Sequence, residues 1–381
     1  MALFQDCRQG KKLTGQKELK EMKEGYKLGG IQQIGIGVKN LKEAWSWYSR
    51  MFGMDCRIFD DKTEANLMLP YTGNVPQSRH AILALNLQSG GGFEVWQYQE
   101  RKPVQIEEEL SLGDLGILVC KIKVKDIREA HSFYKNNHCV LSGEPADDPS
   151  GNPSFFVKDP FGNLFQIVEG NNWFMNENKI SGGAYGAILG VTDIEKSLTI
   201  YSEILGYDHV IYDKTGIFPD LGNLPGGKKE LRRVLLKRTR PFSGYFSRIF
   251  GQSIIELISA PGNPGKRIYQ DRFWGDPGFI HLCFDIFEMD KLREHCISLG
   301  YPFVVDSMDS RNGNSFEMGD AAGHFAYIED PDGILLEFVE SHKMRISKRL
   351  GWYVNLKNRM GYKPLPGWLL KLLRFSRVKD I

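Results

Sequence analysis

A segment that combines a strand with a helix occurs four times in the chain, and this repeat constrains the fold more than any other feature of the sequence. Each copy opens with alternating apolar residues, which predict a strand, and continues with apolar residues at helical spacing. The copies are IQQIGIGVKNLKEAWSWY from Ile31, LVCKIKVKDIREAHSFY from Leu118, YGAILGVTDIEKSLTIY from Tyr185 and FIHLCFDIFEMDKLREHC from Phe279. An internal repeat of this kind predicts four structural modules.

The ends of the modules are also alike. Residues 159–162 (DPFG) and 330–333 (DPDG) predict turns that lead into apolar strands, and the other two modules end in GGFEVWQY and QSIIELISAPG. Each module should therefore contain one strand, one helix and then a run of strands. Such a unit cannot bury its apolar sheet face alone, so we expect the modules to close against each other in pairs.

Composition is typical of a folded chain that is long enough for two cored domains. The 381 residues are 41% hydrophobic and 25% charged, and the net charge of +2 argues against bulk nucleic-acid binding. No apolar run approaches the roughly 20 residues that span a bilayer, and MALFQDCRQGKK lacks a signal-peptide core. The six cysteines form no metal-like spacing and suggest reduced thiols. We therefore expect a cytoplasmic protein.

The register of the repeat identifies matched polar positions in the strands. Five residues before the Val or Ile that closes each first strand lie Gln33, Val119, Gly186 and His281. The matched residues of the last strands are Glu94, Gln166, Glu256 and Glu337. A carboxylate inside an apolar strand is costly to bury without a partner. Taken singly, each residue is more often an ordinary rim or core residue, but their coincidence in one register favours a divalent metal such as zinc, nickel, manganese, cobalt or iron.

The modules resemble a known family. The openings GFIHLCF and QQIGIGV and the ending DPDGILLEF are similar to those of the vicinal oxygen chelate superfamily, which includes glyoxalase I, bleomycin resistance proteins and extradiol dioxygenases. The resemblance covers residues 31–341 and implies an α+β fold, in which four βαβββ modules pair into two half-open mixed β-barrels with helices outside. It also implies metal ligands in the first and last strands of the modules.

Two module pairings are open at this point. Pairing of neighbours, as in two-domain dioxygenases, would join modules 1 and 2 (31–170) and modules 3 and 4 (182–341) and would leave three ligands with Gly186. Pairing of modules 1 and 4, as in fused glyoxalases, would bring together four ligands, namely Gln33, Glu94, His281 and Glu337. We favour this second pairing, because Gln, Glu, His, Glu is the ligand order of one glyoxalase I subfamily; modules 2 and 3 should then hold no metal.

The ligand set predicts the chemistry. An extradiol dioxygenase needs two His and one carboxylate, but His281 is the only His among the four first-strand positions. A metal that chelates two adjacent oxygens of a small-molecule substrate suits proton abstraction and hence isomerase, epimerase or lyase chemistry. We expect Glu337 to be the catalytic base and Glu94 the second catalytic carboxylate. The alternatives are a non-catalytic small-molecule binding or resistance protein and an extradiol-type dioxygenase.

The substrate is less constrained. Glyoxalases of the Gln-ligand type carry an Arg four residues after that Gln, and this chain has Gly37 there, so a glutathione adduct is not expected. Other polar candidates for the pocket are Arg79, His80 and His324. The long insertion of residues 218–251 is compatible with a lid and with an irregular excursion.

Two segments lie outside the repeat. Residues 1–30 predict a helical arm, and residues 342–381 a basic amphipathic tail in which Trp368, Leu369, Leu372 and Leu373 share one helical face beside Lys371 and Arg374. The tail is suited either to peripheral contact with the inner membrane surface or to docking on the protein body or a partner subunit. We expect it to form no part of the metal site, and the protein to be a monomer or homodimer.

Overall fold

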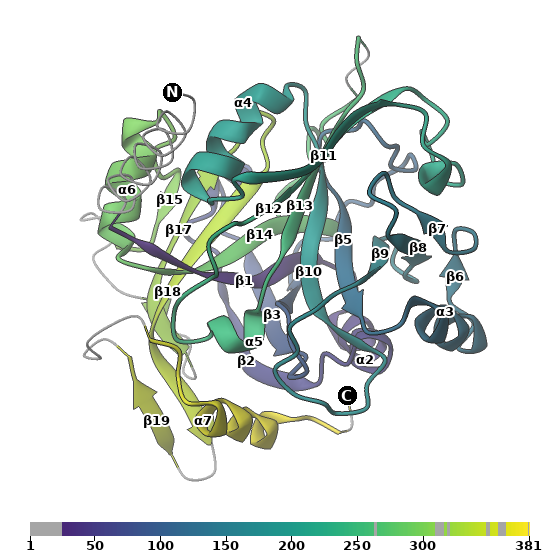
Figure 1. The fold of residues 1–381 in the computed structure, drawn as a ribbon. Coiled ribbons are helices and arrows are strands. Elements are labelled where there is room, and N and C mark those ends of the chain that lie inside the picture. The colour runs from purple at the N-terminus through teal and green to yellow at the C-terminus, as the bar shows by residue number, and fades with distance from the viewer. Residues whose placement is uncertain are drawn as a thin grey trace, which may run out of the picture.

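The computed structural model describes residues 25–262, 265–308, 316–317, 321–347, 351–356, 363–379 and 381. These residues form two strongly curved mixed sheets with the module helices on the outside (Figure 1). The α+β fold with paired βαβββ modules is therefore confirmed. The arm predicted for residues 1–30 lies outside the described residues up to residue 24, and its last four residues belong to the first strand.

Modules 1 and 2 follow the predicted order of elements. Module 1 consists of β1 (Lys27–Gly37), α2 (Leu41–Phe52), β2 (Cys56–Glu64), the short η2 (Leu69–Tyr71), β3 (Ser78–Leu85) and β4 (Gly92–Tyr98). Module 2 consists of β5 (Gly116–Val124), α3 (Ile127–Asn136), β6 (Val140–Leu141), β7 (Ala146–Asp147), β8 (Pro153–Lys158) and β9 (Leu164–Glu169).

Modules 3 and 4 repeat this order. Module 3 consists of β10 (Ser181–Gly190), α4 (Ile194–Leu198), which continues as η3 (Thr199–Ile204), β11 (His209–Gly216), η4 (Pro219–Leu221), β12 (Leu231–Lys237), α5 (Ser247–Phe250) and β13 (Ile254–Ser259). Module 4 consists of β14 (Gly278–Phe287), α6 (Met289–Ser298), β15 (Val305–Asp306), β16 (Phe316–Glu317), β17 (Ala321–Glu329) and β18 (Leu335–Ser347). The chain ends with β19 (Trp352–Asn355), α7 (Gly367–Lys371) and η5 (Leu372–Ser376).

The strand order decides the pairing of the modules. One sheet has the order β15-β17-β18-β14-β1-β4-β3-β2, with β16 on β17 and β19 on β18, and so joins modules 1 and 4. The other has the order β11-β12-β13-β10-β5-β9-β8-β6, with β7 on β8, and joins modules 2 and 3. We call them the outer and inner half-barrels. Pairing of modules 1 and 4 is confirmed, and the alternative pairing of module 1 with 2 and of module 3 with 4 is wrong.

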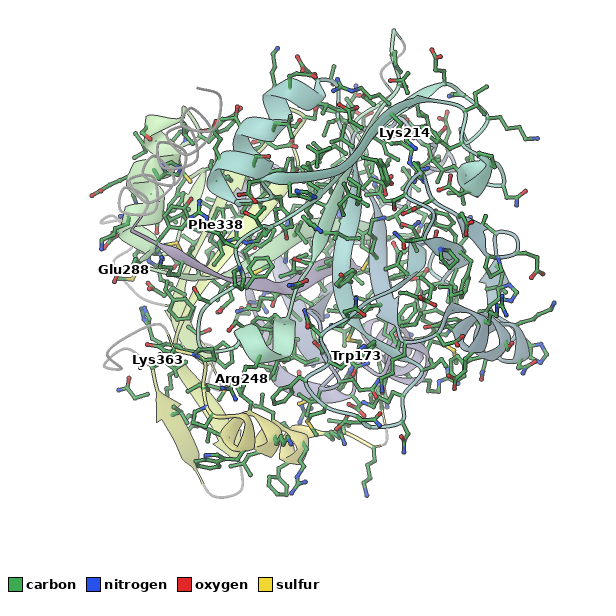
Figure 2. All side chains as sticks on the ribbon, in the orientation of Figure 1. Trp173, Lys214, Arg248, Glu288, Phe338 and Lys363 are labelled. Atoms are coloured by element: carbon green, nitrogen blue, oxygen red, sulfur yellow. The ribbon has the colours of Figure 1, made fainter. Side chains whose placement is uncertain are left out.

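The repeated Tyr of the module helices explains how the two half-barrels pack together. Tyr48 donates a 2.7 Å hydrogen bond to Asp159, and Tyr201 donates one of 3.1 Å to Asp330. Each bond joins a helix to the DPxG turn of the next module, which belongs to the other half-barrel. One large core unites both sheets, and Phe338 of β18 lies within it, whereas Lys214 lies at the surface (Figure 2).

The C-terminal part differs from the predicted boundary. Strand β18 continues to Ser347 and β19 pairs with it, so residues 342–355 extend the outer sheet where they are described. Only α7 and η5 form a separate helical segment among the described C-terminal residues. In the described part of the chain, no helix combines the length and apolar character needed to cross a membrane.

Candidate metal centre

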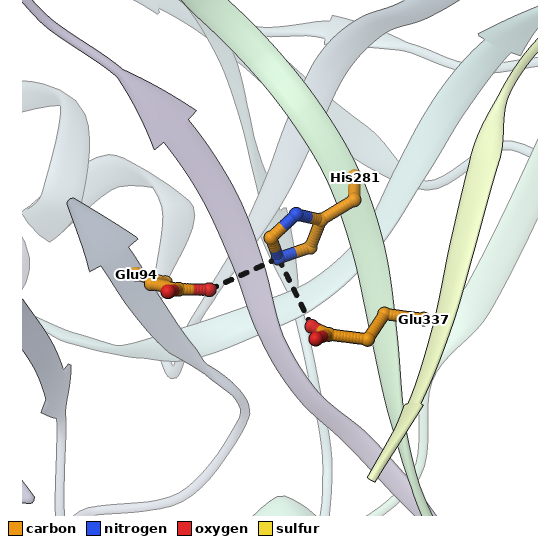
Figure 3. Close-up of side chains that lie close together, drawn as sticks. All are labelled: Glu94, His281 and Glu337. Carbon is orange, nitrogen blue, oxygen red and sulfur yellow. Dashed lines mark ion pairs between the residues drawn. The ribbon is translucent and has the colours of Figure 1, made fainter. Parts of the chain in front are cut away.

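The four predicted ligands converge on one point inside the outer half-barrel. His281 Nε2 lies 3.2 Å from Oε2 of Glu94 and 3.2 Å from Oε2 of Glu337 (Figure 3). Gln33 Nε2 donates hydrogen bonds of 3.0 Å and 3.3 Å to the same two oxygens. All four side chains are buried. The contacts therefore join four strands of two modules, which the chain separates by as many as 304 residues.

Strand register explains why these residues meet. Gly35 of β1 pairs with both His281 of β14 and Glu94 of β4, and Gln33 pairs with Cys283. A Cβ atom at Gly35 would lie 2.4 Å from Cε1 of His281, so glycine is needed to make room for the imidazole. The first and last strands of each module are parallel neighbours, which places the carboxylate of each module beside the centre.

Aromatic residues hold the imidazole in place. The ring of Trp274 stacks on His281 with centroids 5.9 Å apart and an angle of 19°, and Tyr327 meets it edge-on at 5.8 Å. The Tyr327 hydroxyl also donates a 2.7 Å hydrogen bond to Oε1 of Glu337. Sequence reasoning missed Tyr327 and Trp274. Tyr327 pairs directly with Glu337 across β17 and β18, so the hairpin register would have indicated it, whereas nothing in the repeat indicates Trp274.

The electrostatics of the centre are those of a crowded pair of acids with one base. Burial alone would lower the pKa of His281, but the carboxylates of Glu337 and Glu94 raise it above its usual value. Burial raises the pKa of Glu337, and Glu94 adds to this shift against the opposing effect of His281. A proton held by the imidazole cannot fully neutralise two carboxylates. A dication at this point would do so.

The donor atoms fit a divalent metal. Oε1 of Gln33 and Nδ1 of His281 are buried and have no hydrogen bond within the described residues, and Nε2 of His281 has only the two carboxylate contacts at 3.2 Å. Such buried orphans need an explanation, and an ion is one of the common ones. Single atoms of Glu94, His281 and Glu337 all lie within 4.8 Å of one another. Two carboxylates, an imidazole and an amide are suitable ligands for zinc, nickel, manganese, cobalt or iron.

A largely apolar cavity adjoins the centre. Glu94, Glu337 and Gln33 form part of its wall, and its empty volume is about 840 Å³, open solvent at the mouth included. Most of the remaining lining is apolar and includes Ile58, Leu83, Phe246, Phe250, Phe325 and Leu373. Phe246 and Phe250 come from the insertion of module 3, so that insertion contributes a wall of the outer half-barrel. Leu373 shows that the tail reaches the cavity, although no described residue of the tail belongs to the group Glu94, His281 and Glu337.

The other polar candidates do not line this cavity. Arg79 forms a 2.9 Å ion pair with Asp61, His80 lies 2.7 Å from Asp60, and His324 lies 2.7 Å from Asp306. A Cβ atom at Gly37 would lie 2.2 Å from the carbonyl oxygen of Asp276. No side chain fits at residue 37, because the backbone of residues 275–276 occupies the space.

The matched positions of the inner half-barrel are arranged differently. Val119 and Gly186 offer no ligand atom, and the ammonium group of Lys121 lies between Gln166 and Glu256. Lys121 occupies the repeat position of Gly35 and pairs with Gly186 across β5 and β10. Its Nζ is 2.7 Å from Oε2 of Glu256. A covalently attached cation thus lies at the repeat position where the outer half-barrel gathers its candidate ligand atoms.

Further charged groups surround Glu256. Arg233 donates to it at 2.7 Å and pairs with Asp220 at 2.8 Å, while Tyr212 donates at 2.8 Å. Burial would raise the pKa of Glu256, but Arg233 and Lys121 overcome this and lower it to about 2. Glu256 therefore remains ionised and paired with two fixed cations.

Sequence comparison identifies the family. The family model of the Glyoxalase/Bleomycin resistance protein/Dioxygenase superfamily matches residues 30–167 and 185–338, one stretch for each pair of consecutive modules. The chain therefore belongs to this superfamily, as the repeat and the ligand register predicted. No curated protein sequence matches the chain.

Solved structures agree on the fold. Glyoxalase I from Zea mays superposes with a TM-score of 0.50 at 13% identity, over 82% of this chain and 92% of that chain. Its E144Q mutant superposes with a TM-score of 0.53 at 13% identity, over 84% of this chain and 96% of that chain. A "putative dioxygenase" from Bacillus subtilis subsp. subtilis str. 168 gives 0.52 at 15% identity, over 82% and 86%. At such low identity the similarity establishes the architecture alone.

Proposed function

We propose that the chain is a metal-dependent enzyme that isomerises, epimerises or cleaves a small molecule with two adjacent oxygens. The observation that carries this proposal is the convergence of Gln33, Glu94 and Glu337, which line a cavity, on the buried imidazole of His281. Membership of a superfamily that includes glyoxalases supports it. A divalent metal held by these side chains would supply Lewis-acid stabilisation of negative charge on the substrate oxygens.

Glu337 is the proposed catalytic base. Its raised pKa suits a group that accepts a proton from carbon near neutral pH, and the Tyr327 hydroxyl fixes its orientation. Glu94 contacts both His281 and Gln33 through Oε2, on the opposite flank of the imidazole. This arrangement makes Glu94 the second candidate for moving the proton. Re-protonation from that flank would complete an isomerisation or epimerisation.

The cavity indicates the kind of substrate. Its lining contains one cationic side chain, Lys343, beside the two glutamates, and the polar groups Gln32 and Ser341. The backbone at residues 275–276 also excludes an arginine from residue 37. A glutathione adduct carries several charges that these groups would not match. We therefore propose a substrate with an apolar body and a chelating head.

Metal analysis tests the proposal. Protein purified without chelator should contain about one divalent metal per chain, and His281→Ala should lose it because the imidazole is the sole nitrogen ligand. His131→Ala is a suitable control, since that buried His lies in module 2. Full metal content in His281→Ala would contradict the site.

The chemistry is tested with the metal-loaded enzyme. Glu337→Gln should keep metal, since an amide oxygen still coordinates, and should lose about 10²–10⁴-fold in turnover for lack of a proton acceptor. A larger loss in Glu94→Gln would transfer the role of base to Glu94. Solvent deuterium should enter the carbon beside the chelating oxygens. Activity that consumes dioxygen would instead support a dioxygenase, and ligand binding without metal or turnover would support a binding protein.

A further inference from the structure

Residues 363–379, which include α7 and η5, form part of the wall of the cavity in the outer half-barrel. Its inner face consists of Leu369, Leu370 and Leu373, which are all buried. η5 packs against both β2 of module 1 and β18 of module 4, and the Cys56 thiol donates to the carbonyl oxygen of Leu373 at 3.1 Å. The segment therefore connects β2, an edge strand of the outer sheet, with β18, whose C-terminal part pairs with β19 (Figure 1).

The outer face of the same segment exposes two large aromatic side chains. Trp368 is 64% exposed and Phe375 is 66% exposed, the highest values for Phe, Trp or Tyr among the described residues. The predicted apolar face of the helix is therefore divided: Leu369 and Leu373 are buried against the body, and Trp368 faces solvent. A large aromatic side chain in water needs an explanation when a second one lies seven residues away on the same surface.

The exposed charges that residues 363–379 carry beside these aromatics are all positive, whereas Arg377 of the same segment is paired with Glu177 and Asp55. Lys363, Lys371, Arg374 and Lys379 are exposed, and residues 363–379 contain no Asp or Glu. The exposed Arg248 of α5 adds a further cation beside α7, since a Cβ atom at Gly367 would lie 3.5 Å from its Nη1. Figure 2 labels Arg248 and Lys363 on the side of the molecule where the C-terminal segment lies. The whole chain has a net charge of only +2, so this is a local concentration of positive charge.

We propose that residues 363–379 dock the protein on an anionic lipid surface, with the mouth of the cavity facing the bilayer. Exposed Trp and Phe among basic residues are the side chains that bind the boundary between head groups and acyl chains. The helix is too short to span, so contact should be peripheral. Leu373 lines the cavity from this segment, and an apolar substrate would have a short path from the bilayer; that last point rests on the proposed function.

Co-sedimentation with vesicles tests the docking directly. The full-length protein should sediment with phosphatidylglycerol/phosphatidylcholine vesicles, not with pure phosphatidylcholine, and should be released by salt. Lys371→Glu/Arg374→Glu should weaken binding by about 25-fold or more, because each basic residue near an anionic surface changes partitioning by about fivefold. Trp368→Ala/Phe375→Ala should abolish stable binding. All four side chains are exposed, so folding should be unaffected.

Matched variants on another surface serve as controls. Lys228→Glu/Lys229→Glu makes the same change in net charge, and Ile217→Ala removes a side chain that is 67% exposed. Both should bind vesicles as the wild type does, and so should His281→Ala, so failure of the metal assignment would leave this test intact. Absence of wild-type binding, or equal weakening by the control pair, would overturn the proposal. Loss of a dimer in Trp368→Ala/Phe375→Ala would also overturn it, because the face would then be a subunit contact.

Discussion

The two half-barrels bury a glutamate at the same repeat position and neutralise it in different ways. In the outer half-barrel, Glu337 and Glu94 contact an imidazole that can lose its proton, and the pKa of Glu337 is raised. In the inner one, Glu256 is held by Lys121 and Arg233, and its pKa falls to about 2.

The difference comes from two positions. The outer half-barrel has Gly35 opposite His281, whereas the inner one has Lys121 opposite Gly186, at the same points of the repeat. Gly35 makes room for the imidazole of His281, whereas a Cβ atom at Gly186 would meet the backbone carbonyl of Ile254. The imidazole of His281 is short and leaves Glu94 and Glu337 accessible from the cavity. The longer side chain of Lys121 itself forms the ion pair with Glu256.

The largest expected effect concerns stability. Glu256→Gln should destabilise the fold by about 3–5 kcal/mol, because Lys121 and Arg233 would lose a buried counter-charge. Glu337→Gln in metal-free protein should be close to neutral, because it removes one of two repelling carboxylates. Urea unfolding of both variants after chelator treatment measures the contrast. Equal destabilisation would show that the outer site is also a purely structural network.

The second effect concerns metal affinity. Gln33→Leu should weaken metal binding by at least about 10–100-fold, because it removes a candidate ligand. Changes of residues that only support a ligand already cause losses of about this size. Gln166→Leu is the matched change in the inner half-barrel and should leave affinity unaltered. Competitive titration with a chromophoric chelator compares them. A loss of affinity in Gln166→Leu alone would transfer the metal to modules 2 and 3.

The contributions of the two half-barrels to the pH dependence of folding stability should have opposite signs. The raised pKa values of His281 and Glu337 mean that native metal-free protein binds these protons more tightly than the unfolded chain, so both contributions to stability decrease as pH rises through them. The lowered pKa of Glu256 contributes stability above about pH 4 that is lost as pH falls towards 2.

Metal binding should report the outer centre separately. Metal must displace the His281 proton, so metal affinity should fall by up to about tenfold for each unit that the pH decreases once the imidazole is protonated. Because the pKa of His281 is raised, this fall should begin above the usual histidine pKa of about 6.5. Calorimetric titrations at pH 8, 7 and 6 would measure this. An affinity that is constant over this range would exclude His281 as a ligand.

The smallest expected effect concerns the hydrogen bonds that two buried tyrosines donate, Tyr327 to Glu337 and Tyr212 to Glu256. Tyr327→Phe should lower metal affinity by about tenfold, because it frees Oε1 of a ligand carboxylate. Tyr212→Phe removes the corresponding hydrogen bond to Glu256 and should change stability without any change in metal affinity. The same chelator competition, combined with thermal unfolding, distinguishes them. Equal changes in affinity would mean that the half-barrels are coupled.

The repeat predicted the four modules and the matched polar positions, because strand register transfers from one module to the next. The pairing that makes Gln33, Glu94, His281 and Glu337 converge was chosen with the help of the family resemblance. Lys121 escaped prediction, because it lies two residues beyond the matched position and lysine is not among the residue types that suggest a metal ligand. Trp274 lies in a connection that has no repeat counterpart. The wall formed by Phe246, Phe250 and Leu373 depends on insertions and on the chain end, for which periodicity carries no information.

Pairing of the first module with the last has a consequence for synthesis on the ribosome. Modules 2 and 3 are adjacent in the chain and can close their half-barrel, with Lys121 in place, before module 4 exists. Module 1 must wait, because Gln33 meets Glu337 only after 304 further residues have been made. Domains generally fold as units while the chain emerges, and distant contacts form late. The inner half-barrel would thus be the scaffold on which the ends of the chain assemble, and the site would be completed last.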